Sequence, residues 1–217
     1  VDDINNMIQL YIEEIKDILV MEKGTIIPVY IFEKEDVNML DQVTKDGIHM
    51  IIGVHMDRTL QILLRNRILR RLHDIWDELP LQNTWEEVLD EGITLATVNW
   101  QLYGSRKPGH QPYVLTNQVD ILLDEENDLS MTINDVKKFD LKNKFSELSA
   151  QYTGFKQFIM SLDIQEEYDN LLNSKKKTNK SKGKLKIVSN KSLDINDVTC
   201  QTDLDSCVEN FLENHEQ

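Results

Sequence analysis

Two short, almost continuous apolar runs constrain the fold of this chain more than any other feature. They are Ile26–Phe32 and Ile48–Val54, and both are rich in β-branched or aromatic side chains. Runs of this length and composition predict buried β-strands. Pro28 lies within the first run, which indicates either an edge strand or the beginning of a strand.

Helical patterns lie on either side of these two predicted strands. Apolar residues recur at helical spacing over residues 3–20, after the acids Asp2 and Asp3. A second helix is predicted over residues 58–78, with Asp57 as its cap. Helices and strands that alternate over the first ~130 residues predict an α+β or α/β sheet domain.

The second predicted helix carries four positive charges. They are Arg65, Arg67, Arg70 and Arg71. A solvated helix face is the favoured interpretation, and contact with a nucleic-acid backbone is the alternative.

The rest of the chain predicts shorter elements and a change of composition. The elements are a short helix at Trp85–Leu89 leading to Asp90, strands at Ile93–Tyr103 and Val119–Leu123, an acidic turn at Asp124–Asp128, and helical patterns at 134–148 and 155–172. Residues 1–150 are therefore expected to form the main domain and residues 151–173 a helical extension. Residues 174–191 hold eight lysines and no acid, which predicts a basic flexible linker. Residues 192–217 are expected to begin a further domain or to form a disordered tail.

Composition limits the classes of partner. The formal net charge is −14, with 38 acidic against 24 basic residues, so any nucleic-acid contact is expected to be local or to use metal ions. The two cysteines, Cys200 and Cys207, form no metal-ligand or disulfide pattern, which suits a reducing compartment. Neither a signal peptide nor an apolar run of about 20 residues is present, so no membrane contact is expected.

Two segments have the residue types of an anion site. The segment around Ser105 follows the apolar residues Trp100–Tyr103 and leads into the cations Arg106 and Lys107. Small residues beside cations let backbone amides and positive charge approach one anion, although an ordinary surface hairpin explains the same pattern. Near the second predicted strand, Gly47 lets the backbone approach a phosphate that Lys45 and His49 could bind. A structural histidine is the alternative.

Asp90 is the candidate for metal chemistry. It lies between an apolar helix and the next predicted strand, where a helix-terminal acid is the ordinary explanation. Opposite a phosphate cradle, however, one carboxylate is a natural Mg²⁺ ligand. The sequence contains no GxxxxGK[ST] motif, so it has no P-loop of its own.

Three blocks together resemble the archaeo-eukaryotic primase superfamily. Lys45–Ile52 (KDGIHMII) is similar to its second motif, Leu89–Glu91 (LDE) to its third, and Asn99–Pro108 (NWQLYGSRKP) to the segment that follows, with Lys107 17 positions after Asp90. The most similar members are the primase regions of primase–helicases of nucleocytoplasmic large DNA viruses, of the poxvirus and giant-virus type. The resemblance implies an α+β fold with a primase-type (RRM-like) mixed sheet flanked by helices, followed by a helical segment and the basic linker. Residues 1–150 would be the C-terminal part of the primase catalytic domain.

The resemblance also implies roles for individual residues. His49 would contact the phosphates of the incoming nucleotide as a catalytic residue, with Lys45 and Gly47 beside it. Asp90 would be a catalytic residue that binds Mg²⁺ or Mn²⁺. Ser105, Arg106 and Lys107 would bind the triphosphate or the template backbone. Gly47 replaces a serine that is common in the family, and the first motif, an acid-x-acid pair on a strand, is expected upstream of Val1, so that this chain alone is not expected to catalyse.

The implied function is DNA primase activity, a nucleotidyl transfer from NTPs on a single-stranded DNA template during viral DNA replication. A helicase domain on the same polypeptide or other replication proteins would be partners, at the viral replication site in the host cytoplasm or in the nucleus, without secretion. One alternative is a non-catalytic module that binds nucleotides or single-stranded nucleic acid. The other is a structural interaction domain in which Asp90 and His49 are unrelated.

Overall fold

The computed structural model describes residues 2–40, 42–45, 47–76, 79, 81–95, 97, 100–124, 126 and 128–181. The chain divides into two compact units, Val1–Lys176 and Lys177–Gln217. The fold described below is that of the first unit. Most of the predicted linker and all of residues 192–217 lie outside the described residues, so the predictions for them stay predictions.

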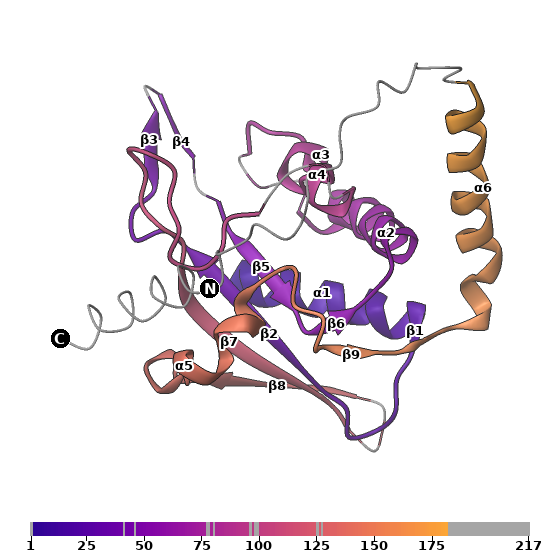
Figure 1. Ribbon diagram of the computed structural model, residues 1–217, viewed down its shortest axis with the longest axis horizontal. Coiled ribbons are helices and arrows are strands. Elements are labelled where there is room, and N and C mark those ends of the chain that lie inside the picture. The colour runs from indigo at the N-terminus through magenta and orange to yellow at the C-terminus, as the bar shows by residue number, and fades with distance from the viewer. Residues whose placement is uncertain are drawn as a thin grey trace, which may run out of the picture. The chain divides into compact units, whose positions relative to one another are not determined.

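A four-stranded antiparallel sheet forms the centre of the first unit (Figure 1). Its strands follow the order β5 (His49–Ile52), β2 (Ile26–Glu33), β7 (Val114–Leu123) and β8 (Leu129–Asn134). The α+β class is therefore confirmed. The expected mixture of strand directions is not found in this sheet; a short parallel pair, β6 (Val54–His55) with β9 (Lys156–Gln157), lies beside it.

Two helices cover one face of the sheet, which we call the helical face (Figure 1). They are α1 (Asp2–Ile18) and α2 (Arg58–Trp76), close to the predicted ranges. Asp57 caps α2 as predicted, because its carboxylate accepts the backbone N–H groups of Thr59 and Leu60 at 2.7 and 2.9 Å. Fully buried aliphatic side chains fill the space between helices and sheet, including Ile8, Ile12, Ile15, Val29, Ile31, Leu63, Ile68 and Leu72.

Four arginines of α2 form ion pairs or hydrogen bonds with other parts of the chain. Arg71 pairs with Glu13 and Glu14 of α1 at 2.8 and 3.0 Å. Arg67 lies 3.6 Å from Glu14, and Arg67 and Arg70 both bind Glu167 of α6 (Gln165–Ser181). Arg65 donates to the carbonyl oxygens of Glu86 and Leu89. The ion pairs were not foreseen in the interpretation as a solvated face, although the Arg70 side chain is 65% exposed, and contact with a nucleic-acid backbone stays a prediction.

Gly53 explains why the second apolar run gives two strands. Its N–H donates to the carbonyl oxygen of Pro28 at 2.8 Å, and a Cβ on Gly53 would lie 2.6 Å from the proline ring. The chain that follows β5 departs from β2 at Gly53, and β6 begins there as a separate strand. Pro28 lies near the beginning of β2, which is an interior strand. β5 ends at Ile52, which pairs with Val29, so no residue of β5 needs an N–H group from Pro28. The strand-beginning interpretation is confirmed and the edge-strand interpretation is wrong.

The opposite face, which we call the aromatic face, is covered by loops and short helices. Tyr30, Phe32 and Ile51 of the sheet pack there against Trp100, Tyr103, Tyr113, Leu115, Phe139, Leu141, Leu148 and Phe155. The helical pattern of residues 134–148 becomes three short pieces, η1 (Val136–Lys138), α5 (Leu141–Lys144) and η2 (Phe145–Leu148). Asp135 and Asp140 each cap a new helix start, which divides the pattern. Tyr30 donates to the carboxylate of Glu147 and ties η2 to the sheet.

Several predicted elements differ in the structure. The strand predicted at Ile93–Tyr103 is wrong: Asp90 caps a short helix, α4 (Glu91–Thr94), and residues 100–103 form a loop. The short helix α3 (Trp85–Val88) is confirmed. The strand β8 was not predicted, nor was the hairpin of β3 (Asn38–Leu40) and β4 (Val43–Lys45) within a segment expected to be a polar loop.

The predicted helix at 155–172 begins later than expected. Its first part forms β9 and β10 (Ile159–Met160), the latter paired with β1 (Leu19–Val20). The turn η3 (Leu162–Ile164) then leads into α6, which continues to Ser181 and so enters the range predicted as a linker. Among the helices of the described residues, none is long and apolar enough to span a membrane.

Candidate functional site

The strand β5 places His49 on the aromatic face, in register with Phe32 of β2. The imidazole ring stacks on the ring of Tyr113, with the centroids 3.8 Å apart and the planes at 17°. Trp100 contacts the same imidazole at 4.8 Å between centroids. His49 therefore lies in an aromatic cluster formed with the loop of residues 100–113.

Gly47 allows Tyr113 to reach this position. A Cβ on Gly47 would lie 2.6 Å from the Tyr113 hydroxyl oxygen, which is closer than side chains tolerate. The absence of a side chain was predicted to admit a phosphate, and the structure shows that it also admits the phenol ring. The Lys34 ammonium lies 5.2 Å from the centroid of the same ring, at cation–π distance.

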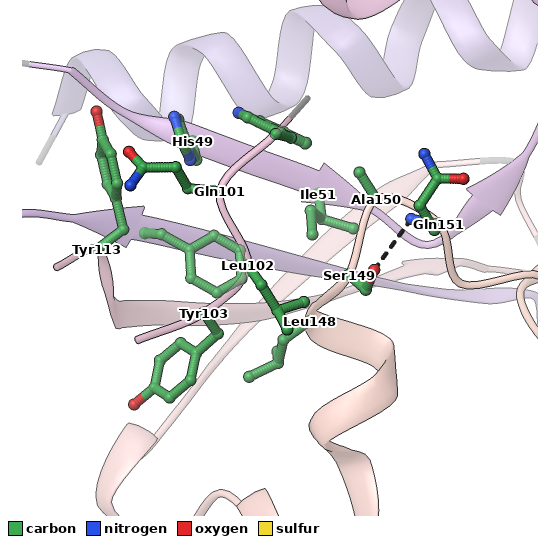
Figure 2. A pocket seen from close by; sticks show the side chains of 12 residues that line it. His49, Ile51, Gln101, Leu102, Tyr103, Tyr113, Leu148, Ser149, Ala150 and Gln151 are labelled. Carbon is green, nitrogen blue, oxygen red and sulfur yellow. Dashed lines mark hydrogen bonds between the residues drawn. The ribbon is translucent and has the colours of Figure 1, made fainter. Parts of the chain in front are cut away.

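A pocket of about 200 Å³ opens beside His49 (Figure 2). Its walls come from three parts of the chain: strands β2 and β5, the loop of residues 100–113, and the segment that follows η2. The lining residues are Phe32, His49, Ile51, Trp100, Gln101, Leu102, Tyr103, Tyr113, Leu148, Ser149, Ala150 and Gln151. Rings and aliphatic side chains predominate, and Gln101, Ser149 and Gln151 supply polar atoms.

The charge state of His49 follows from this environment. Burial first, and then the positive charges of Lys34 and Lys107, lower the pKa of His49 from 6.5 to about 4. The ring is therefore neutral near pH 7 and can donate one hydrogen bond but supplies no positive charge. Lys107 is near enough for its charge to lower the pKa of His49, but neither Lys107 nor Lys34 is among the described residues that line the pocket.

The other predicted site residues have different surroundings. Ser105 donates its hydroxyl to the carbonyl oxygen of Leu102 at 2.7 Å, which stabilises the turn. Arg106 is exposed, and Lys45 lies in β4 opposite Asn38. These three positions are not among the residues that line the pocket.

Asp90 acts as a helix cap in this structure. Its exposed carboxylate accepts the N–H of Gly92 at 2.8 Å, and Arg65 holds the preceding carbonyl, that of Leu89, at 2.7 and 2.9 Å. Asp90 does not line the His49 pocket. In the described part of the chain, no group of three or more His, Cys, Asp or Glu side chains could hold a metal ion.

Phe32 and Lys34, at the end of β2, were missed as site residues. Phe32 lies directly opposite His49, and Lys34 follows two positions later, where its charge acts on His49. A β-bulge at Thr116 of β7 shifts the register at the same place, since Ile31 faces Asn117 whereas Phe32 faces Leu115. The signal in the sequence was the period of two along the strand, which places Tyr30, Phe32 and Lys34 on one side.

The same segment contains an acid-x-acid pair, Glu33 and Glu35, that was also overlooked. Strand alternation places Glu33 on the other side from Phe32, and its carboxylate accepts the hydroxyl of Thr116. Asp36 is bound by Gln111 through two hydrogen bonds of 2.7 and 2.9 Å. A second hollow lies here. It is lined by Glu33, Lys34, Glu35, Gln111, Pro112, Val114 and Thr116, and none of these residues lines the His49 pocket.

Comparison with known proteins agrees with the resemblance seen in the sequence. Residues 1–119 match the family described as "C962R protein N-terminal AEP domain". The chain is also 31% identical over 118 residues to the "Putative helicase L207/L206" of Acanthamoeba polyphaga mimivirus, a match that covers 52% of this chain and 12% of that protein. The chain therefore belongs to the family of C962R-type AEP domains, within the archaeo-eukaryotic primase superfamily.

Proposed function

We propose that this chain is the nucleotide-binding part of a DNA primase that makes primers during viral DNA replication. The observation that carries the proposal is the pocket beside His49, because it lies at the motif histidine of a primase-type domain and is lined by aromatic rings and amide groups. The neutral imidazole would donate its N–H to a phosphate oxygen, and Lys34 and Lys107 would supply positive charge. Family membership over residues 1–119 supports the same function.

Within this proposal, the described residues bind and orient the nucleotide. The aromatic cluster holds His49 in place, and the loop of residues 100–113 brings Lys107 towards it. A bound divalent metal would stabilise the charge that develops at the reacting phosphate. Mg²⁺ or Mn²⁺ is proposed for the intact protein, with Asp90 as one ligand.

The partners proposed for the intact protein are NTPs, a single-stranded DNA template and a helicase domain on the same polypeptide. The mimivirus relative is named as a helicase and is much longer than the matched region, which supports the last of these. The proposed location is the viral replication site in the host cytoplasm or the nucleus.

The test is primer synthesis by the intact protein. Labelled NTPs and a single-stranded template would be supplied with Mg²⁺ or Mn²⁺. We expect His49→Ala and Asp90→Ala to lower the rate by at least about 100-fold, the scale of a lost transition-state contact. The exposed Lys137→Ala is the matched control. Full activity of both site variants would contradict the proposal.

A nucleotide-binding module without chemistry is the second candidate. One observation favours it: Phe32 of β2 lies directly opposite His49, and none of the described residues that line the pocket beside His49 is a carboxylate that could share a metal with it. An intact polypeptide that binds nucleotides but synthesises no primer would support this candidate. A polypeptide that does neither would leave the structural interaction domain as the remaining explanation.

A further inference from the structure

We propose that strand β8 is a pairing surface for a second copy of this chain, so that two sheets join edge to edge through antiparallel β8 strands. β8 lies at one edge of the sheet and beyond residues 1–119, the range that matches the family. The inference is independent of nucleotide binding at the His49 pocket. Four features of the molecule support it.

The first feature is an edge without the usual protection against strand addition. β8 pairs with β7 over six consecutive residues without a shift in register, and no other strand of the described residues pairs with it. Edge strands are commonly protected by a lysine, a proline or a bulge, yet LSMTIN contains no charged residue and no proline. The outward N–H and C=O groups of β8 are therefore suited to pairing with another strand.

The second feature is the apolar side chains that β8 exposes. Met131 pairs with Ile121 and Ile133 pairs with Val119, and both β7 residues are buried on the helical face. Residues that face each other across antiparallel strands share a side of the sheet, so Met131 and Ile133 also lie on the helical face. They are nevertheless 37% and 62% exposed, which shows that the helices do not cover them. A strand added beside β8 would cover both side chains.

The third feature is the charge at the two ends of β8, which indicates what kind of partner fits. Residues 124–128, before β8, contain four acids and no lysine. Residues 135–144, after β8, contain four lysines and two acids, and Figure 1 shows α5 at this end of the strand. When two copies of β8 pair antiparallel, each end of one strand lies beside the opposite end of the other. The acidic turn of each copy therefore approaches the lysine-rich segment of the other.

The fourth feature is that β8 is complementary to itself. A two-fold symmetric interface uses the same surface of both copies. Because facing residues share a side of the sheet, the symmetry axis passes beside one residue, Met131 or Thr132 at the middle of the strand. An axis at Met131 places Leu129 opposite Ile133 of the partner subunit, and an axis at Thr132 places Met131 there. In both arrangements apolar side chains face apolar ones on the helical face.

The test is the oligomeric state of the full 217-residue chain, measured by sedimentation velocity over a range of concentrations. We expect a dimer with a Kd of about 1–100 μM, because an edge of six residues gives a contact at the small end of the range for specific interfaces. Ile133→Lys should raise this Kd at least about tenfold, since a lysine on an edge strand opposes strand pairing. Leu162→Lys is the matched control, because Leu162 is 84% exposed and lies outside the sheet.

A charge reversal tests the orientation of the two strands. Glu126→Lys removes an exposed acid from the turn before β8 and places a cation near the lysine-rich segment of the other copy. We expect it to raise the Kd by about threefold, the scale of a charge at the rim of an interface. Circular dichroism of each variant checks that it is folded.

Cross-linking locates the contact without relying on a destabilising variant. In a chain with Cys200→Ser and Cys207→Ser, we would introduce Met131→Cys or Thr132→Cys and add a short bis-maleimide reagent. We expect one of these cysteines to give a covalent dimer in high yield, because it lies at the two-fold axis. Leu162→Cys should not.

The possible results separate this inference from the proposed function. A chain that is monomeric at every concentration would overturn the inference. A dimer that survives Ile133→Lys and is not cross-linked through β8 would overturn the choice of surface. Slow amide exchange of residues 129–134 in the intact protein, with a monomeric chain, would assign this edge to another part of that polypeptide and overturn the second copy as its occupant. None of these results changes nucleotide binding, which is measured separately.

Discussion

The helical face of the sheet is packed with aliphatic side chains from α1 and α2, whereas the aromatic face is covered by rings from loops and short helices. On the helical face Ile12, Leu63 and Leu72 have no exposed surface. On the aromatic face a pocket of about 200 Å³ remains between the sheet and its cover. Close packing stabilises a fold, but a binding site needs open space. The two faces therefore divide stability from ligand binding, and the following changes test this division.

The largest effect is expected from a cavity on the helical face. Leu72→Ala should lower the free energy of unfolding by about 2–5 kcal/mol, because a fully buried leucine is truncated among neighbours that cannot collapse around it. Denaturant unfolding measures the change. Leu162→Ala is the control, since Leu162 is 84% exposed and should change stability by less than about 0.5 kcal/mol. Equal effects at both positions would contradict the assignment of the core.

A smaller loss of stability is expected when the ion pairs between α1 and α2, the helices that cover the helical face, are broken. Glu14 is buried between Arg67 and Arg71, so Glu14→Ala leaves two partly buried cations with less compensation. The expected cost is about 1–3 kcal/mol, again by denaturant unfolding. Glu166→Ala, on an exposed position next to Glu167, is the control. Nucleotide affinity should stay the same in both variants, and a parallel loss of affinity would show that the faces are coupled.

Gly47→Ala should affect the aromatic face instead. The added methyl group would overlap the Tyr113 hydroxyl, so the phenol ring has to leave its stack on His49. We expect a destabilisation of about 1–3 kcal/mol from this overpacking, and a clear loss of ATP affinity in a titration followed by tryptophan fluorescence. Gly109→Ala is unsuited as a control because of its positive φ, so Lys137→Ala, at an exposed position outside the pocket, takes that place. Unchanged ATP affinity in Gly47→Ala would contradict the role of the stack.

The smallest effect is a pH dependence that comes from His49. Its pKa is lowered from 6.5 to about 4 in the folded chain, first by burial and then by Lys34 and Lys107. Between these values the unfolded chain binds more protons than the folded chain, so stability falls as pH decreases from about 6.5 towards 4. Thermal unfolding across this window should show a shallower slope in His49→Asn than in the parent chain. An identical slope would show that His49 is not buried as described.

The sequence alone located α1, α2, β2 and β5, because each is encoded by a local pattern of apolar residues with its own cap or boundary. Through motifs of the primase superfamily it also predicted that His49, Gly47 and Lys107 belong to one site; the structure shows His49 and Gly47 against the same Tyr113 side chain, and their shared role stays a prediction. The predictions from the sequence were wrong where a contact between residues distant in the sequence determines the secondary structure. Residues 134–148 have a helical period, yet two aspartate caps and the attachment of Tyr30 to Glu147 divide them.

Only the tertiary structure decided what the charged and aromatic residues do. Arg67 of α2 pairs with Glu167 of α6, 100 positions away in the sequence. No local pattern predicts this ion pair, which connects the two helices. His49 meets Tyr113 and Lys34 because antiparallel pairing and a bulge bring distant segments to the same end of the sheet. Local periodicity fixes which side of an element is apolar, but strand register fixes which side chains become neighbours. The site of this protein is built from such neighbours.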